Sequence, residues 1–202
     1  VTTLSVQNNT SFAPTSTSVF PSSLTSLDIS GCTSFAPPST SVFPSSLTSL
    51  DISGCTSITA LDVLPTTLTE LYINGLEFSN KSNLSGFTSL TTLSANDCGI
   101  LDSDLFHLYL LPAIQVLSLK NNELTDVSLL FNLKNTLDYL YVNGNRICNI
   151  SPTDYPASIT FGVDNQDDTL CNECPVSSSY PSVDFGSNTI CDELWSAKYE
   201  TN

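Results

Sequence analysis

The sequence predicts an α/β solenoid of about seven or eight coils, each 21 to 24 residues long, in which every coil adds one strand to a parallel β-sheet. Three observations predict it. Residues 11–33 recur almost unchanged as residues 34–56, with Pro38 in place of Thr15 as the one difference. The apolar pattern L-x-x-L-x-L recurs along most of the chain, and its starts lie 21 to 24 residues apart. Such a period is typical of repeat proteins, which bury a core only by stacking neighbouring units.

Seven units share the pattern as nine-residue blocks. An eighth, degenerate unit is expected around Ile159, in "SITFGVDNQ". Alternating apolar residues such as Leu27 and Ile29 predict a short strand with one buried face, which is stable only beside neighbouring strands. The duplicated segments are therefore interpreted as adjacent coils. The seven blocks begin at Val1, Leu24, Leu47, Leu68, Leu90, Ile114 and Leu137.

The segments that connect the strands change along the chain. Prolines exclude regular helix from the first connections, so we expect extended or polyproline-like backbone there. Later, Leu105, Leu108 and Leu111 recur at helical spacing after Asp102 or Ser103, and "DVSLLFNL" predicts a second short helical turn. The first half is thus expected to be rich in sheet. The prolines concerned are Pro14, Pro21, Pro37, Pro38 and Pro44.

The repeat resembles the leucine-rich repeat family, whose consensus L-x-x-L-x-L-x-x-N/C-x-L is matched over roughly residues 1–165. The resemblance implies a horseshoe with the sheet on its concave face, a mostly irregular or short-helical convex face, and buried Asn residues that hydrogen-bond turn backbone. Cysteines at the Asn position are expected to be buried free thiols. Only Leu76 departs from Asn or Cys there. This ninth block position reads Asn9, Cys32, Cys55, Leu76, Cys98, Asn122 and Asn145.

Residues 1–147 are expected to form the solenoid, and residues 148–202 a degenerate last repeat with a disulfide-stapled cap. A solenoid end exposes apolar core, so cysteines gathered there predict two disulfides. Three pairings are possible, of which Cys171 to Cys174 would close a loop of four residues and constrain little. A four-cysteine zinc site is the alternative. Disulfide caps in secreted relatives of such repeats imply an oxidising compartment. The candidates are Cys148, Cys171, Cys174 and Cys191.

Candidate modification and binding residues follow from motifs and from the repeat. N-glycosylation sequons become candidates if the chain enters the secretory pathway. Strand side chains that point away from the core form columns on the concave face, where tyrosines and acids are candidate contact residues. The threonines Thr2, Thr25, Thr48, Thr69 and Thr91 share one column, which we attribute to β-propensity. The sequons lie at Asn8, Asn80, Asn83 and Asn149, and the concave-face candidates are Asp28, Asp51, Glu70, Tyr72, Asp138, Tyr139 and Tyr141.

Charge and missing motifs argue against other classes of function. With 20 acidic and five basic residues the formal charge is −15, so we expect neither a nucleic-acid partner nor an anionic membrane surface. No apolar run of about 20 residues predicts a membrane span. The one histidine, His107, lies in a predicted helical turn, and no phosphate-binding Gly motif, HExxH or GxSxG occurs. We expect no enzyme activity, metal or cofactor.

Two functions fit these features. The first is a non-enzymatic extracellular or cell-surface protein that binds a protein or glycan through its concave face. The second is a structural glycoprotein subunit of an extracellular fibre or coat, because Val1 opens directly on a strand and a second copy could stack on it. In that case the partners are further copies of the chain.

Overall fold

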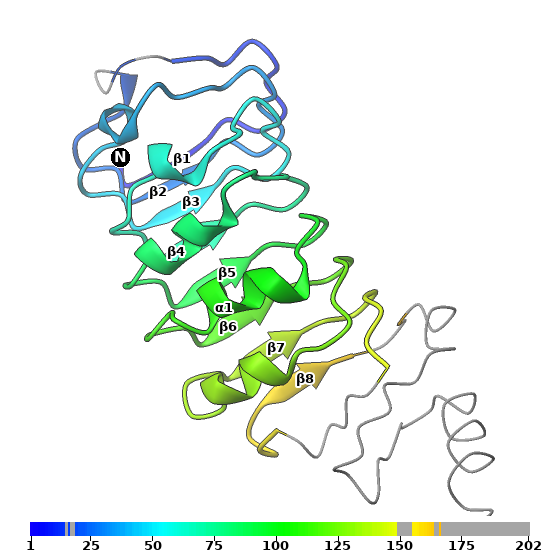
Figure 1. Cartoon of the computed structure of the whole chain (residues 1–202). Coiled ribbons are helices and arrows are strands. Elements are labelled where there is room, and N and C mark those ends of the chain that lie inside the picture. Colours follow the sequence, from blue (N-terminus) through cyan, green and yellow to red (C-terminus); the bar gives the residue numbers. More distant parts are fainter. Residues whose placement is uncertain (15, 17–18, 149–154, 164–165, 167–202) are drawn as a thin grey trace, which may run out of the picture.

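The computed structural model describes residues 1–14, 16, 19–148, 155–163 and 166. It contains one sheet of eight parallel strands arranged in the order of the sequence, which confirms the predicted solenoid (Figure 1). The last strand lies within the degenerate eighth unit. The strands are β1 (Thr3–Ser5), β2 (Ser26–Asp28), β3 (Ser49–Asp51), β4 (Glu70–Tyr72), β5 (Thr92–Ser94), β6 (Val116–Ser118), β7 (Tyr139–Tyr141) and β8 (Thr160–Gly162).

Every strand pairs with the next at the same position of the repeat. The central residues form one continuous column from Leu4 through Leu27 and Leu50 to Phe161. Their side chains point into the core, so a slip of one residue would turn this whole apolar column outward. The spacing of the leucines therefore fixes the register of the sheet.

Short helical turns connect the strands. The predicted helix after Ser103 is present, with Leu105, Leu108 and Leu111 buried. In the proline-rich connection our expectation of no helix needs a correction, because Thr40–Val42 form one 3₁₀ turn closed by the Phe43 amide on the Thr40 carbonyl at 3.1 Å. The elements are η2 (Thr40–Val42), η3 (Leu61–Val63), η4 (Lys81–Gly86), η5 (Asp102–Asp104), α1 (Leu105–Leu108) and η6 (Ser128–Leu133).

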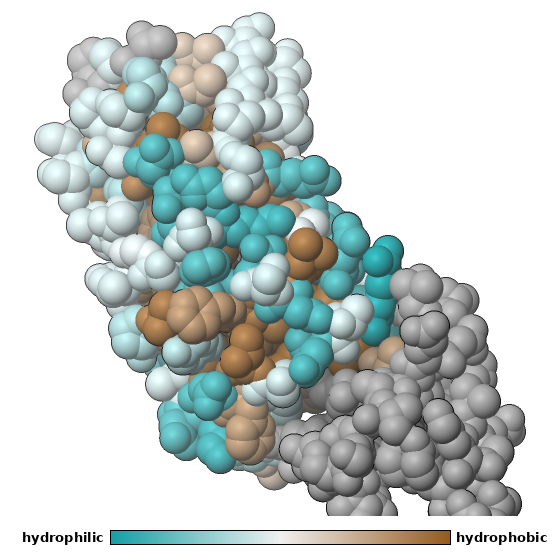
Figure 2. Space-filling view, in the orientation of Figure 1, coloured by the Kyte–Doolittle hydropathy of each residue, from teal (hydrophilic) through white to brown (hydrophobic). Residues whose placement is uncertain are grey.

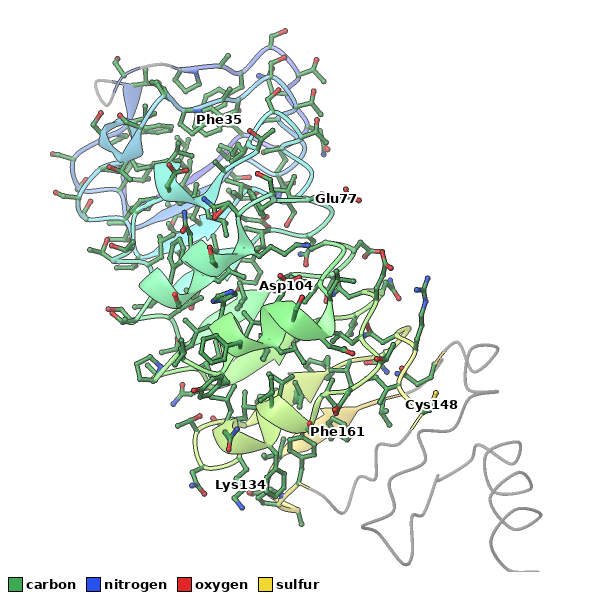
Figure 3. All side chains as sticks on the ribbon, viewed as in Figure 1. Phe35, Glu77, Asp104, Lys134, Cys148 and Phe161 are labelled. Carbon is green, nitrogen blue, oxygen red and sulfur yellow. The ribbon has the colours of Figure 1, made fainter. Side chains whose placement is uncertain are left out.

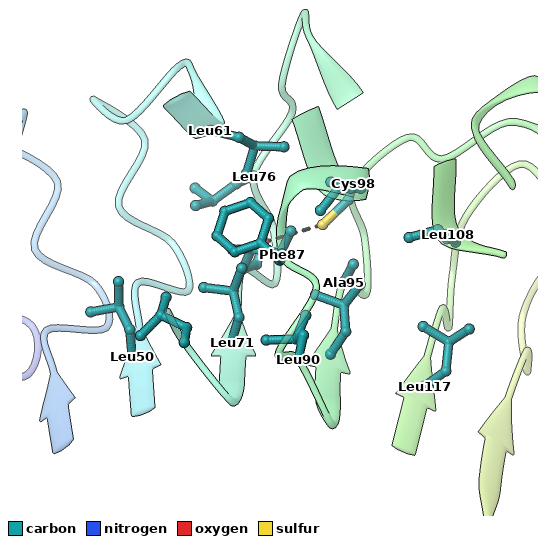
Figure 4. Close-up of a cluster of buried hydrophobic side chains, with 14 of the residues drawn as sticks. Leu50, Leu61, Leu71, Leu76, Phe87, Leu90, Ala95, Cys98, Leu108 and Leu117 are labelled. Atoms are coloured by element: carbon teal, nitrogen blue, oxygen red, sulfur yellow. Dashed lines mark hydrogen bonds between the residues drawn. The ribbon is translucent and has the colours of Figure 1, made fainter. Parts of the chain in front are cut away.

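A single apolar core runs through the described coils. Leu71, Phe87 and Leu90 pack together in its middle (Figure 4). In the first two coils, phenylalanines from the connecting segments pack together in the core. Phe35 is fully buried, with its ring centroid 5.9 Å from that of Phe12 and 6.0 Å from that of Phe43. The two copies of the duplicated segment thus contribute equivalent rings to one aromatic cluster.

The ninth block position forms a hydrogen-bond ladder from coil to coil. Cys32, Cys55 and Cys98 are buried free thiols, as predicted. Each donates its S–H to a main-chain carbonyl of the preceding coil, at 2.8, 3.0 and 3.2 Å respectively. Leu76 packs in the core at this position (Figure 4). Because a leucine has no polar atom, its coil lacks a side-chain rung, and the exposed Asn9 of the first coil accepts only the local Ser11 amide at 3.1 Å.

The later coils use amides for the same purpose. Asn122 accepts hydrogen bonds from the Cys98 and Ile100 amides, both at 3.0 Å, and donates to the Ala95 carbonyl at 2.9 Å. Asn145 donates to the Leu119 carbonyl at 2.9 Å. A buried amide that is fully paired in this way stabilises the turn, whereas an unpaired one would cost about 1 to 3 kcal/mol.

The eighth block position needs a left-handed backbone. All seven residues there have positive φ angles, between 53° and 72°. Glycine adopts this conformation without strain, and Asn and Asp tolerate it better than other residues. This explains why the position holds only Gly, Asn or Asp. The residues are Asn8, Gly31, Gly54, Gly75, Asp97, Asn121 and Gly144.

The outer surface differs between the two halves. Figure 2 shows pale, weakly polar surface over the first coils and a mixture of strongly hydrophilic and strongly hydrophobic patches over the later ones. Exposed apolar side chains of the later coils come from α1, η6 and the residues beside them. None of the described helices has the length and apolarity to span a membrane. These exposed side chains are Leu101, Phe106, Leu110, Leu129 and Phe131.

Candidate binding face

The strand register builds two columns on the concave face. One column holds position 3 of each block and the other holds position 5, as the sequence predicted. Side chains in a column follow each other at the strand spacing of about 4.8 Å. The columns are Thr3, Ser26, Ser49, Glu70, Thr92, Val116, Tyr139, Thr160 and Ser5, Asp28, Asp51, Tyr72, Ser94, Ser118, Tyr141, Gly162.

Acidic side chains occupy the face in the second and third coils. Asp28 and Asp51 are directly opposite each other on β2 and β3. Asp28 accepts hydrogen bonds from the Ser30 amide and hydroxyl at 3.0 and 2.8 Å, and from the Gln7 side chain. Burial would raise the pKa of Asp28, but these bonds lower it below its ordinary value. Asp51 accepts the Ser53 amide at 2.8 Å.

The acidic group extends to the fourth coil. Glu70 lies beside Ser49 in the register, and the Ser49 hydroxyl donates to Glu70 Oε2 at 2.9 Å. On the same strand Tyr72 follows Asp51 in the other column. Burial raises the pKa of the Tyr72 phenol, and the charges of Glu70 and Asp51 raise it further. The phenol therefore stays protonated and can donate a hydrogen bond.

An amide and hydroxyl network occupies the middle of the face. Asn74 Oδ1 accepts the Ser94 hydroxyl at 2.8 Å and the Asn96 amide at 2.9 Å. Asn96 Oδ1 repeats this one coil later, with the Ser118 hydroxyl and the Lys120 amide at 2.8 Å each. Our sequence reasoning missed these amides. The signal that could have found them is their place two residues after the outward serines or tyrosines of each strand.

An aromatic pair marks the seventh coil. The rings of Tyr139 and Tyr141 stack with centroids 6.3 Å apart, and Tyr139 is 43% exposed. Lys120 Nζ lies 4.7 Å from the centroid of the Tyr141 ring, a cation–π contact. Asp138 immediately precedes this strand and is exposed. The face thus has an acidic part, a neutral middle and an aromatic part, which together contain six of the seven candidate contact residues, while Asp138 lies one residue before β7 and outside the two columns.

The threonine column has a hydrogen-bonding role that the sequence did not reveal. The Thr25 hydroxyl donates to the Thr2 carbonyl at 3.0 Å. The hydroxyls of Thr48, Thr69 and Thr91 each donate to the preceding threonine's carbonyl at 3.0 to 3.2 Å. These hydroxyls donate to the main chain of the preceding coil, so the column links neighbouring coils as well as favouring strand.

The predicted modification residues fall in different settings. Asn8 has a left-handed backbone, and its side chain lies over Gly31 of the next coil. Asn80 precedes η4 and accepts the Ser82 hydroxyl at 3.4 Å, whereas Asn83 lies within η4. Between them Lys81 contacts Asp104 at 3.5 Å, which anchors this segment to the following coil. Asn149 lies outside the described residues.

The cap predictions are only partly within the described chain. Cys148 follows the seventh coil (Figure 3) and is disulfide-bonded. Cys171, Cys174 and Cys191 lie outside the described residues, so the cap and its pairing stay predictions. Among residues that the structure describes, no group of three or more His, Cys, Asp or Glu side chains could hold a metal ion. His107 is half-buried in α1, against the ring of Phe106.

Similar structures carry the same architecture. No protein-family model and no curated protein matches the sequence. The crystal structure of the TLR13–ssRNA13 complex superposes with a TM-score of 0.63 at 20% identity, over 82% of this chain and 25% of that one. An internalin (InlF) from Listeria monocytogenes str. 4b F2365 gives 0.55 at 21% identity, over 75% and 45%. Both are leucine-rich repeat proteins. This chain has a leucine-rich repeat fold.

The leucine-rich repeat fold accounts for the sheet, the connections and the buried side-chain hydrogen bonds of this structure. The parallel sheet, the short-helical connections and the buried Asn rungs are the features that the repeat predicted. The chain spans about a quarter of the TLR13 chain and under half of the internalin chain. At 20% and 21% sequence identity the similarity shows only a shared fold. What the concave face binds has to be inferred from the residues of this chain.

Proposed function

We propose that this protein is a non-enzymatic, extracellular or cell-surface binding protein that holds a protein or glycan ligand on its concave face. The observation that carries the proposal is the pair of register columns, which align Tyr72 and Tyr141 with the acids Asp28 and Asp51. Tyrosines contribute large contact areas at low entropic cost, and they are enriched among the residues that dominate binding energy. The TLR13 chain, which shares this fold, was solved in complex with an RNA ligand, which supports a binding function here.

Selection from a random peptide library tests the use of this face. Ser94 lies in the middle of one concave column, so Ser94→Arg should block a bound ligand without disturbing the core. Selected ligands should lose most of their affinity for Ser94→Arg and keep it for Ser85→Arg, a matched change outside the sheet in η4. Selected ligands whose affinity is unchanged by Ser94→Arg would contradict the proposal.

The extracellular location rests on two features. One is the disulfide at Cys148, since disulfides persist in oxidising compartments. The other is the group of sequons, of which Asn80 and Asn83 lie at the surface connection η4. Expression in a secretory host followed by glycosidase digestion should show a mass loss that is smaller in Asn80→Gln/Asn83→Gln, which keeps the sequons at Asn8 and Asn149. An unglycosylated, fully reduced natural protein would contradict this location.

We do not propose nucleic acid as a ligand of this chain. One structural neighbour was solved with a single-stranded RNA. A net charge of −15 repels phosphates, and phosphate contacts supply most of the affinity of nucleic-acid binding proteins. We expect no retention on immobilised single-stranded RNA at physiological salt. Retention that survives a polyanion competitor would reverse this expectation.

The fibre hypothesis remains the alternative. β1 is the first strand of the sheet, and Leu4 and Val6 of the first coil are only partly buried. A stacked second copy would cover them, and so would preceding residues of a longer chain. Electron microscopy of the natural material separates the two functions, because filaments are expected only for the structural subunit.

A further inference from the structure

The charged side chains that precede Lys81 in the chain are all acidic. Residues 1–80 contain five acidic side chains and no Lys, Arg or His. Three of the five, Asp28, Asp51 and Glu70, stand on the concave face of β2, β3 and β4. The two ion pairs found among the described residues are Lys81–Asp104 and Arg146–Glu123, both away from this face. Within the described chain these three carboxylates therefore have no cationic partner.

The carboxylates are held in place by neutral donors. Asp28 and Asp51 each accept the main-chain amide two residues further on, and Glu70 accepts the Ser49 hydroxyl. Asp28 and Asp51 are opposed on neighbouring strands, which brings two like charges to about 5 Å apart, an arrangement that destabilises a sheet unless a counter-charge offsets it. The hydrogen bonds fix the geometry of the charges but do not neutralise them.

Tyrosines share the face with the acidic residues. Tyr72 stands next to Asp51 in one column, and Tyr141, further along the same column, stacks on Tyr139. Tyrosine faces attract ammonium and guanidinium groups, as the contact of Lys120 with Tyr141 shows within the chain itself. Acids and tyrosines on one face are therefore complementary to the same kind of ligand group.

From this complementarity we infer that the partner of the concave face is a basic protein segment, whose Lys or Arg side chains lie over Asp28, Asp51 and Glu70. This inference rests on the proposed function, and it names the partner class. Positive charge on the partner would relieve the repulsion between the opposed aspartates and would speed association by electrostatic steering. Glycans without amines, which the proposed function also allows, offer no such counter-charge.

A labelled octalysine peptide is the probe, with binding followed by fluorescence anisotropy at about 0.15 M salt, where charges farther apart than about 8 Å are screened. Asp28→Asn/Asp51→Asn/Glu70→Gln keeps the oxygen acceptors and removes three charges, so the protein should still fold. We expect its affinity to fall at least about tenfold, as for loss of close charge pairs. The matched control Asp62→Asn/Glu77→Gln/Glu123→Gln removes three exposed charges off the face and should change affinity by less than about twofold.

Two results would overturn the inference. Either the unmodified protein fails to bind octalysine, or both triple variants weaken it equally, which would indicate only the overall negative charge. The peptide selection with Ser94→Arg keeps this failure separate from that of the proposed function. If ligands bind the concave face but are not enriched in Lys or Arg, the basic partner is contradicted and the proposed function stands. If the ligands bind elsewhere on the protein, the proposed function and the basic partner are both contradicted. Enrichment of Lys and Arg among concave-face ligands supports both.

Discussion

The ninth block position holds Cys in some coils and Asn in others, and the two residues hydrogen-bond the preceding coil in different ways. Both must satisfy a carbonyl of the preceding coil. The thiols of Cys32, Cys55 and Cys98 supply one weak donor each. The amide of Asn122 supplies donors to two carbonyls and accepts two main-chain amides. The amide rung therefore ties the turn of the preceding coil as well as its strand end.

The connections also change along the chain. Phenylalanine rings pack together in the connections of the first two coils, which carry Asn9 and Cys32 at the ninth position. Short helical turns fill the connections of the later coils, with α1 in the coil of Cys98 and η6 in the coil of Asn122. We infer that aromatic packing supplies in the first half part of the stability that polar rungs supply in the second. The following variants test this division.

The largest effect is expected from Phe35→Ala. The Phe35 ring is fully buried between Phe12 and Phe43, so its removal leaves a cavity that two rigid neighbours cannot fill. Such changes cost about 3 to 5 kcal/mol of unfolding free energy, measured by urea denaturation. Phe12→Ala is the control, because Phe12 is only partly buried and should cost less. Equal losses would show that the cluster does not depend on its central ring.

Asn122→Leu should come next, with a loss of about 3 kcal/mol, because two main-chain amides and a carbonyl lose their buried partner. Asn122→Cys sharpens the comparison, since a thiol can still donate to Ala95 but cannot accept both amides well. It should retain part of the stability in the same urea titration. If Asn122→Cys is as stable as the unmodified protein, the two kinds of rung are equivalent and the comparison fails.

Much of this architecture could be predicted because apolar spacing alone fixes the register. The seven block starts place Leu27, Leu50 and their equivalents in one column, and the concave columns follow from it. The eighth rung could not be predicted. Pairing of Leu140 with Phe161 puts the block start at Ser158, a polar residue where a leucine is usual. Gln166 then takes the ninth position, where its amide contacts the Ile147 amide and the Val142 carbonyl at 2.9 Å each.

For the binding face, too, the sequence predicted only part of the structure. The sequence identified Asp28, Asp51 and Tyr72 as outward residues, because alternation in a strand is enough for that. It did not identify the partners of these residues, such as Gln7 and Ser30 for Asp28, since those contacts depend on turns and on the preceding coil. Periodicity predicts which way a side chain points, whereas hydrogen bonds across coils need coordinates.

A smaller effect is expected for the thiol coils at alkaline pH. Burial raises the pKa of the Cys55 thiol from 9.0 to about 11, because the thiolate would lie in the core. Below pH 9 the thiol is neutral in both the folded and unfolded protein, so its contribution to stability is constant. Between pH 9 and 11 the unfolded protein loses the proton more readily, and stability falls. Urea titrations of the protein and of Cys55→Ala across this range should diverge, with the alanine variant showing the smaller decline.

The smallest effect concerns the threonine column, which both halves share. Thr69→Val removes a hydroxyl that donates to the Thr48 carbonyl at 3.1 Å, but that carbonyl also accepts the Thr69 and Glu70 amides at 2.8 and 3.0 Å. Because the acceptor stays paired and valine favours strands as threonine does, we expect a loss of only about 0.5 kcal/mol. Thr92→Val is the matched control on the concave face of β5, where no loss is expected. A loss above about 1.5 kcal/mol for Thr69→Val, beyond the usual net value of one hydrogen bond, would mean that the column is a main tie between coils.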